Sequence, residues 1–103
     1  MDAGGLALSK DRSTSAAPID YHFGLVLDAA GFPTLGGAVV RHAYQEHGVV
    51  DCDPSLAFPA LPIGGKLRIA PNHACMTAAA HDRYYVVDGS DEVIAIWTRV
   101  NGW

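Results

Sequence analysis

Short apolar runs that alternate with Gly, Pro, Asp and Ser residues constrain the fold of this chain more than any other feature. The clearest runs are residues 21–27, followed by a turn at 28–31, and the pair 83–87 and 93–97 around a turn at 88–91. Short strands bounded by turn residues are typical of β proteins, and two of them joined by a short polar turn form a hairpin. The pattern therefore predicts an all-β fold with minor α content, built as a small β-barrel or sandwich.

Two further strands are predicted at residues 5–8 and 66–70. The second is expected to end before Pro71, because a proline has no N–H to donate to a strand ladder. The residues that follow Pro71 are therefore expected at the end of a strand, which is a common place for a functional site.

The middle of the chain mixes strand and loop signals. Residues 38–50 are long enough for two strands, or for one strand bent by a bulge near Gly48. Three prolines and a Gly-Gly pair predict a loop over residues 51–65. Only residues 76–81, which contain three consecutive alanines, favour a helical turn.

Size and charge limit the class of protein. With 103 residues, of which 50% are hydrophobic, the chain is expected to form one domain over residues 1–103 with a modest core. The formal net charge is −4 and no basic stripe is present, which argues against nucleic acid as a partner. No apolar run approaches the roughly 18 residues of a membrane span. The first residues also lack the order of a signal peptide, so we expect a cytoplasmic protein without membrane contact.

His73 and Cys75 form the first candidate site. Two residues apart on an extended backbone, their side chains are expected on the same side, where one divalent cation can contact both. The alternative is a structural role, with Cys75 as a small buried apolar residue. We treat Cys52 and Cys75 as thiols or ligands rather than as a disulfide, because disulfides are rare in small cytosolic domains.

Two other polar groups interrupt the apolar pattern. Gln45, Glu46 and His47 fall within a predicted strand region, where polar side chains must be hydrogen-bonded or exposed. They either pin a bulge or contribute to a site from its second layer. His81 and Asp82 either add a polar contribution near a metal or form a loop pair that caps the next strand.

Several blocks of this sequence, in the same order, resemble one family. They are residues 2–11, 45–48, 67–75, the hairpin that ends in Trp97 and the terminal segment 101–103. Together they are similar to the C-terminal β domain of D-threonine aldolases and eukaryotic-type D-serine dehydratases, which are pyridoxal-phosphate enzymes of the alanine-racemase fold type. The resemblance covers nearly the whole chain.

The resemblance implies a fold like the C-terminal domain of alanine-racemase-type enzymes and a metal site at His73 and Cys75. Cysteine as a ligand favours zinc, and manganese is the alternative. In this family pyridoxal phosphate is held on a lysine of a separate (β/α)₈ barrel of about 200 or more residues. Lys10 lies in the first block of the β domain and does not match that lysine. The resemblance thus implies that the chain alone is inactive and needs a barrel domain or subunit as its partner.

The same resemblance suggests a second layer or substrate pocket around the metal. Its candidate residues are Gln45, Glu46, His47, Asn72, His81 and Asp82. A domain without its barrel is also expected to expose a strand edge and an apolar patch, which predicts a homodimer.

Two functions follow from the sequence. The first is the metal-binding domain of a lyase that acts on β-hydroxy D-amino acids, either a D-threonine aldolase or a D-serine dehydratase. The second is a free-standing, non-catalytic β module that binds a small ligand or a protein partner. The residues do not choose between aldolase and dehydratase.

Overall fold

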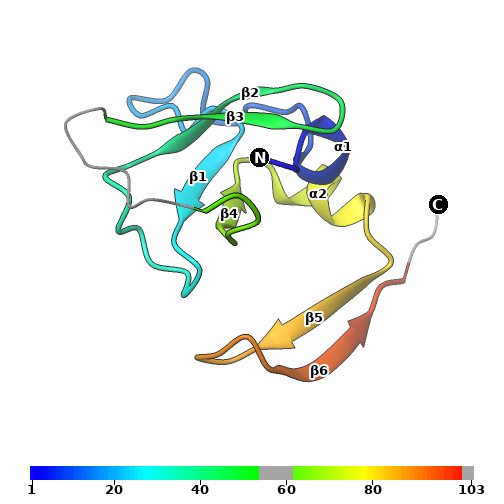
Figure 1. Ribbon diagram of the computed structural model, residues 1–103. Coiled ribbons are helices and arrows are strands. Elements are labelled where there is room, and N and C mark those ends of the chain that lie inside the picture. The colour runs from blue at the N-terminus through cyan, green and yellow to red at the C-terminus, as the bar shows by residue number, and fades with distance from the viewer. Residues whose placement is uncertain (54–61, 101–103) are drawn as a thin grey trace.

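The computed structural model describes residues 1–53 and 62–100 as a mostly β structure with two short helices (Figure 1). The elements in chain order are α1 Gly5–Leu8, β1 Gly24–Leu27, β2 Val39–Ala43, β3 Gly48–Asp51, β4 Arg68–Pro71, α2 Ala74–Ala79, β5 Arg83–Val87 and β6 Val93–Thr98. Neighbouring strands are antiparallel throughout, in a four-stranded sheet of order β3-β2-β1-β4 and a separate β5–β6 pair. The mostly β class is confirmed. The described strands form two open sheets, so the barrel or sandwich detail is not confirmed.

The prediction of a strand at residues 5–8 is wrong, because these residues form α1. Their backbone N–H groups are used in a turn: Leu8 N–H donates to the Gly4 carbonyl at 2.9 Å, while Gly5 N–H donates to the Tyr44 carbonyl at 2.6 Å. A Cβ at Gly4 would lie 2.5 Å from that Tyr44 oxygen, so only glycine allows this approach. Tertiary contact with the β2–β3 turn therefore overrides the local pattern.

The strand prediction for residues 21–27 is confirmed at its C-terminal end by β1, and the turn that follows is confirmed as well. Asp28 organises this turn. Its side chain accepts hydrogen bonds from the Phe32 N–H at 2.9 Å and the Thr34 hydroxyl at 2.7 Å, and its carbonyl accepts from the Gly31 N–H at 3.0 Å. The bonds from Phe32 and Thr34 to the side chain favour the charged carboxylate, so the pKa of Asp28 is lowered.

Residues 38–50 form two strands, β2 and β3, as one of the two alternatives predicted. The register between them shifts from Val40 to His42, which places the bulge in β2 rather than near Gly48. Of the predicted loop over 51–65, residue 51 ends β3 and a turn closes with Gly65 N–H donating to the Pro62 carbonyl at 2.7 Å. Residues 54–61 lie outside the described part.

The strand predicted at 66–70 is observed as β4, which begins two residues later, at Arg68. The expectation that it ends before Pro71 is wrong, because Pro71 is paired with Gly24 of β1. Proline is tolerated because β4 is an edge strand in the described sheet. The predicted helical turn at 76–81 is observed as α2, which begins at Ala74. The hairpin is confirmed by β5 and β6, with Tyr84 opposite Trp97.

The core lies in the four-stranded sheet and its flanking segments. Val26 and Val40 are 1% and 0% exposed, and Leu8, Leu35 and Ala38 pack with them. Figure 1 shows the β5–β6 hairpin standing apart from this sheet and joined to it through α2. Among the described residues, no helix has the length and apolar character needed to traverse a membrane.

Candidate metal centre

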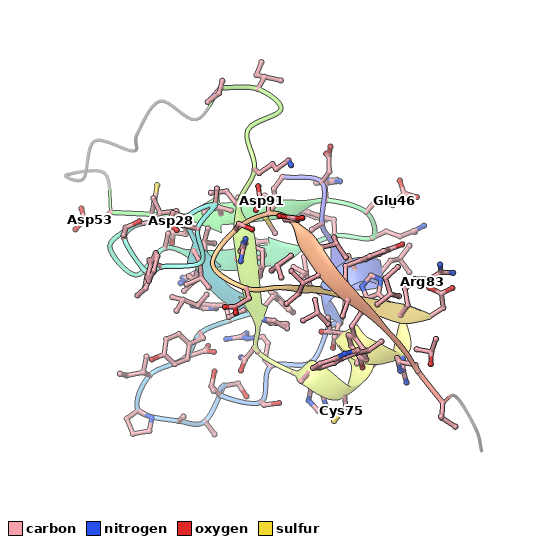
Figure 2. All side chains as sticks on the ribbon, turned by 90° about the horizontal axis from the view of Figure 1, so that it is seen from below. Asp28, Glu46, Asp53, Cys75, Arg83 and Asp91 are labelled. Atoms are coloured by element: carbon pink, nitrogen blue, oxygen red, sulfur yellow. The ribbon has the colours of Figure 1, made fainter. Side chains whose placement is uncertain are left out.

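His73 and Cys75 lie at the junction between β4 and α2. His73 is the N-cap of α2 with an extended backbone at φ −132° and ψ 105°, whereas Cys75 belongs to the first helical turn. The prediction that both residues share an extended backbone is therefore wrong for Cys75. Cys75 is exposed, not a buried apolar residue, and Figure 2 shows it on the outer side of α2. An exposed thiol next to a histidine at a chain junction is accessible to an ion from solvent.

The imidazole of His73 has polar neighbours on its Nδ1 side. The Ser13 hydroxyl oxygen lies 2.8 Å from Nδ1, and the Asp11 carboxylate oxygen Oδ2 lies 3.1 Å from the same atom. The His73 side chain is 28% exposed. No sequence pattern indicates Asp11 or Ser13, because 60 residues separate Ser13 from His73 and polar loop residues have no distinctive pattern.

Asn72 fastens the end of β4 to the segment that precedes β1. Its side-chain amide donates to the Thr14 hydroxyl at 2.8 Å and to the His22 carbonyl at 2.6 Å. Both amide hydrogens are thus used within the chain. This arrangement gives Asn72 a structural part in holding residues 14–22 beside His73, whereas its predicted part in a substrate pocket stays a prediction.

Asp20 stabilises the same segment. Partial burial acts to raise the pKa of this carboxyl group, but hydrogen bonds from the His22 backbone N–H and the Arg12 guanidinium outweigh it, so the pKa of Asp20 is lowered. The carboxylate therefore remains charged at neutral pH and keeps residues 12–22 folded next to the candidate site.

Gln45, Glu46 and His47 lie in the exposed turn between β2 and β3, not within a strand. The Tyr44 N–H donates to the His47 carbonyl at 2.9 Å, and the two rings stack with centroids 4.9 Å apart. Residues 45–47 do not pin the bulge, because the bulge lies within β2. Figure 2 shows Glu46 and Cys75 on separate parts of the molecule, so this chain alone does not bring the two groups together.

His81 and Asp82 connect α2 to β5. His81 Nε2 lies 3.4 Å from the Ala7 carbonyl oxygen of α1, and Asp82 pairs with Arg83 at 2.7 Å. The hydrogen bond and charge of the Arg83 guanidinium lower the pKa of Asp82. These contacts fit the predicted loop pair before the next strand, and neither side chain contacts His73 or Cys75 in the contacts described.

The donors at this junction fit a metal ion with an open coordination shell. An imidazole nitrogen and a thiolate are ligands that zinc prefers, and solvent or substrate oxygen can fill the other positions. Within the described residues, no group of three or more His, Cys, Asp and Glu side chains is arranged to hold a metal ion. A metal site at His73 and Cys75 would have two protein donors among the described residues and stays a prediction.

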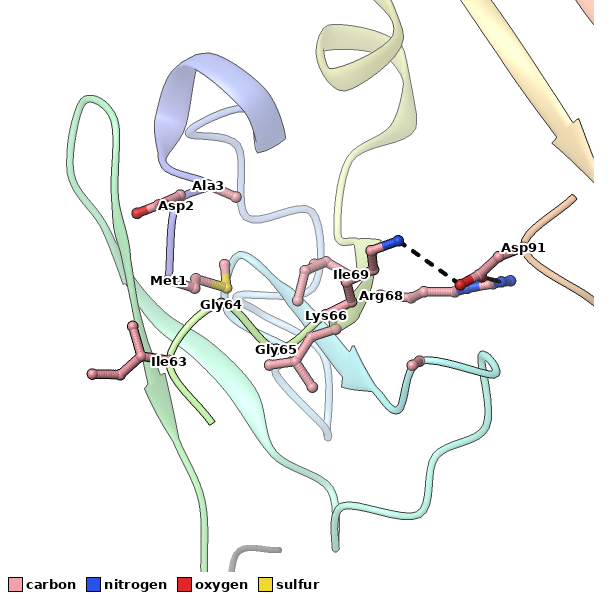
Figure 3. Close-up of a pocket in the computed structure, with 12 residues that line it drawn as sticks. Met1, Asp2, Ala3, Ile63, Gly64, Gly65, Lys66, Arg68, Ile69 and Asp91 are labelled. Carbon is pink, nitrogen blue, oxygen red and sulfur yellow. Dashed lines mark hydrogen bonds and ion pairs between the residues drawn. The ribbon is translucent and has the colours of Figure 1, made fainter. Parts of the chain in front are cut away.

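Two pockets lie near the sheet. The larger, about 650 Å³, is lined by Met1, Ile63 and the charged residues Lys66, Arg68 and Asp91 (Figure 3). Asp91 approaches Arg68 at 2.9 Å and Lys66 at 4.0 Å, which ties the turn of the β5–β6 hairpin to the start of β4. A smaller pocket of about 240 Å³ runs along β1 and β4. Its lining is Tyr21, Leu25, Ala70, Pro71 and Asn72. Asn72, which lines this smaller pocket, directly precedes the candidate ligand His73 in sequence.

Known proteins provide an independent comparison. The family described as putative serine dehydratase domain matches residues 1–87. The whole chain is 36% identical to 28% of the D-threo-3-hydroxyaspartate dehydratase of a Delftia species, and 36% identical to 22% of the D-serine dehydratase of Schizosaccharomyces pombe. The chain thus spans about a quarter of the length of these relatives.

Solved structures agree with the sequence matches. An alanine-racemase-like protein of Idiomarina loihiensis superposes with a TM-score of 0.83 at 40% identity, over 99% of this chain and 27% of that one. Two further structures, with TM-scores of 0.76 and 0.75, are alanine variants of a D-threo-3-hydroxyaspartate dehydratase, one at a cysteine and one at a histidine two positions before it, and the cysteine variant is in a metal-free form. On the family match and these similarities, the chain belongs to the putative serine dehydratase domain family.

Proposed function

We propose that this chain is the metal-binding C-terminal domain of a pyridoxal-phosphate-dependent dehydratase that acts on β-hydroxy D-amino acids. The observation that carries the proposal is the His73-x-Cys75 pair at the β4–α2 junction. A D-threo-3-hydroxyaspartate dehydratase whose structure resembles this chain has been varied at a histidine and a cysteine with the same spacing, and the structure of the cysteine variant is in a metal-free form. Zinc is the ion that the nitrogen and sulfur donors favour, with manganese as the alternative.

The two named relatives support dehydration over aldol cleavage, because both are dehydratases of β-hydroxy D-amino acids. A divalent cation bound here would supply Lewis-acid stabilisation for the hydroxyl that departs in such a reaction. His73 and Cys75 would hold it through an imidazole nitrogen and a thiolate. The remaining chemistry belongs to pyridoxal phosphate on a barrel domain or subunit, which is the partner proposed for this chain.

We also propose that apolar side chains of the β5–β6 hairpin meet that barrel or a second copy of the chain. Tyr85, Ile94 and Ile96, which strand alternation places on one face of the hairpin, are 61%, 60% and 55% exposed. On the other face, Trp97 is 62% exposed and lies opposite Tyr84. Aromatic and aliphatic side chains grouped on an exposed hairpin mark an interaction surface. A homodimer is the expected assembly when the barrel is absent.

Zinc retention tests the metal site. Wild-type protein, His73→Ala, Cys75→Ala and the matched control Cys52→Ala are dialysed with zinc and then without it, and bound metal is measured. Because the site has two protein ligands, removal of either should reduce bound zinc from about one ion per chain to background, while Cys52→Ala should retain it. Equal zinc content in all four proteins would contradict the metal site.

A chimera tests the catalytic part of the proposal. The matching C-terminal quarter of the Delftia dehydratase is replaced with this chain, and turnover of D-threo-3-hydroxyaspartate is measured. The chimera should be active and its His73→Ala variant should lose activity with added zinc present, because the ion then lacks a ligand. The chain alone should be inactive. A folded chimera that binds zinc and has no activity would instead favour a non-catalytic binding module.

A further inference from the structure

We infer that Asp11 is a positioning residue that selects the tautomer of His73, so that Nε2 is the nitrogen that binds the metal. The inference rests on the proposed metal site and adds a residue to it that no sequence pattern indicated. Its basis is the pair of contacts at Nδ1, 2.8 Å to the Ser13 hydroxyl and 3.1 Å to the Asp11 carboxylate.

The chemistry of these two neighbours decides where the proton lies. The Ser13 hydroxyl can donate to Nδ1 or accept from it, and alone it leaves both tautomers open. The Asp11 carboxylate has only acceptor oxygens, so a lone pair on Nδ1 would face its negative charge at 3.1 Å. A proton on Nδ1 removes this repulsion and is shared between the carboxylate and the hydroxyl. The neutral imidazole then has its free lone pair on Nε2.

The segment that carries Asp11 is attached to the site on both sides. Thr77 of α2 places its hydroxyl oxygen 2.5 Å from the Leu8 carbonyl oxygen and 2.8 Å from that of His73. On the other side, Asn72 donates to Thr14 at 2.8 Å. The segment from residue 8 to residue 14 is therefore bound to Asn72, directly before His73, and to Thr77, one helical turn after it.

Asp11 itself is held by a local turn. Its backbone N–H donates to the Ser9 hydroxyl at 2.9 Å, and Ser9 is 5% exposed with a left-handed φ of 84°. A buried non-glycine residue in that region is uncommon and needs support from its surroundings. Here the support includes the Ser9 N–H, which donates to the Gly5 carbonyl at 3.0 Å. The turn directs the chain so that Asp11 reaches Nδ1.

The geometry assigns Asp11 to His73 rather than to the ion. Its carboxylate contacts the Nδ1 atom, and the described residues contain no three-residue group suited to metal binding. A carboxylate that accepts the second N–H of a metal-binding histidine fixes the ring and raises its basicity. Residues in this position typically contribute about 10- to 100-fold to metal affinity.

Two measurements on the whole chain test the inference. Zinc affinity is measured by competition with a chromophoric chelator, and the histidine tautomers of the metal-free protein are read from ¹⁵N chemical shifts. The variants are Asp11→Asn, which keeps the shape and offers an amide donor to Nδ1, and Ser13→Ala. Asp88→Asn is the matched control, because Asp88 is an exposed carboxylate in the hairpin turn.

The expected result is a Nδ1–H tautomer for His73 in wild type and a shift toward Nε2–H in Asp11→Asn. Zinc affinity should fall about 10- to 100-fold in Asp11→Asn, less in Ser13→Ala and not in Asp88→Asn. Wild type that binds zinc with an Nε2–H tautomer, or Asp11→Asn with unchanged affinity and tautomer, would overturn the role of Asp11 and leave the metal site standing. Wild type that binds no zinc would overturn the proposed metal site, while the tautomer shift would still report on the contact with Asp11.

Discussion

The four-stranded sheet and the β5–β6 hairpin have similar apolar strands and opposite environments. In the sheet, Val26 and Val40 are almost completely buried. In the hairpin, Tyr85, Ile96 and Trp97 are 61%, 55% and 62% exposed. Strand composition alone is therefore a poor guide to which strands this chain buries by itself.

The hairpin is attached to the rest of the molecule chiefly by polar contacts at its two ends. Asp91 in its turn pairs with Arg68 of β4, and Arg99 at its base donates to the Ala78 carbonyl of α2. An isolated two-stranded hairpin is only marginally stable in water. The difference teaches that the sheet contains its own core, whereas the hairpin leaves large apolar side chains exposed, for which we propose a surface outside this chain.

The largest expected effect separates the two regions by stability. Val40→Ala should lower the free energy of unfolding by about 2 kcal/mol, because it removes two buried methyl groups from the core. The matched substitution Val93→Ala, at a hairpin residue that is 47% exposed, should change it by less than about 0.5 kcal/mol. Urea denaturation followed by circular dichroism measures both. Equal losses would show that the hairpin and sheet share one core.

The next effect concerns association. Trp97→Ala should weaken self-association about tenfold or more, because exposed tryptophans on an apolar surface often dominate binding. Phe32→Ala is the matched control, since Phe32 is an aromatic residue that is 63% exposed and lies in the turn after β1, outside the hairpin. Sedimentation across a dilution series measures the assembly.

A wild-type protein that stays monomeric at high micromolar concentration would contradict this account of the hairpin. So would an equal loss of association in the Phe32→Ala protein. Either result would indicate that the exposed side chains of the hairpin contact solvent and do not form an association surface.

The comparison also explains which parts of the fold were predictable. β1, β2, β3 and the hairpin follow local alternation and turn residues, which the sequence displays. Residues 5–8 do not, because their helix depends on Gly4 packing against the Tyr44 carbonyl. Their partner lies about 40 residues away in sequence, and local patterns contain no information on such contacts.

The candidate site divides in the same way. His73 and Cys75 are a candidate pair on ligand types and spacing, and their part in a metal site stays a prediction. The helical position of Cys75 was not predictable from the spacing. Asp11 could not be predicted, because its role depends on a contact with His73 across most of the chain. The strand position expected for residues 45–47 is wrong, because polar residues in an exposed turn and in a strand have similar composition. Their part in a site stays a prediction.

The smallest expected effect tests whether acid acts on the sheet and the hairpin through different carboxylates. Asp28 has a lowered pKa in the folded chain, so the folded state binds fewer protons than the unfolded state, whose value is about 3.9. The resulting stability is present above that value and is lost as the pH falls through the lower folded value. Between about pH 5 and pH 2, the unfolding free energy of wild type should therefore fall more steeply than that of Asp28→Asn.

Asp82→Asn should leave the slope unchanged, because its partner Arg83 is adjacent in sequence and stays near it in the unfolded chain. Urea midpoints measured across the pH series test both expectations. Parallel curves of unfolding free energy against pH for wild type and Asp28→Asn would show that the Asp28 turn is not part of the cooperative unit. A flatter curve for Asp82→Asn would show that the hairpin is part of that unit.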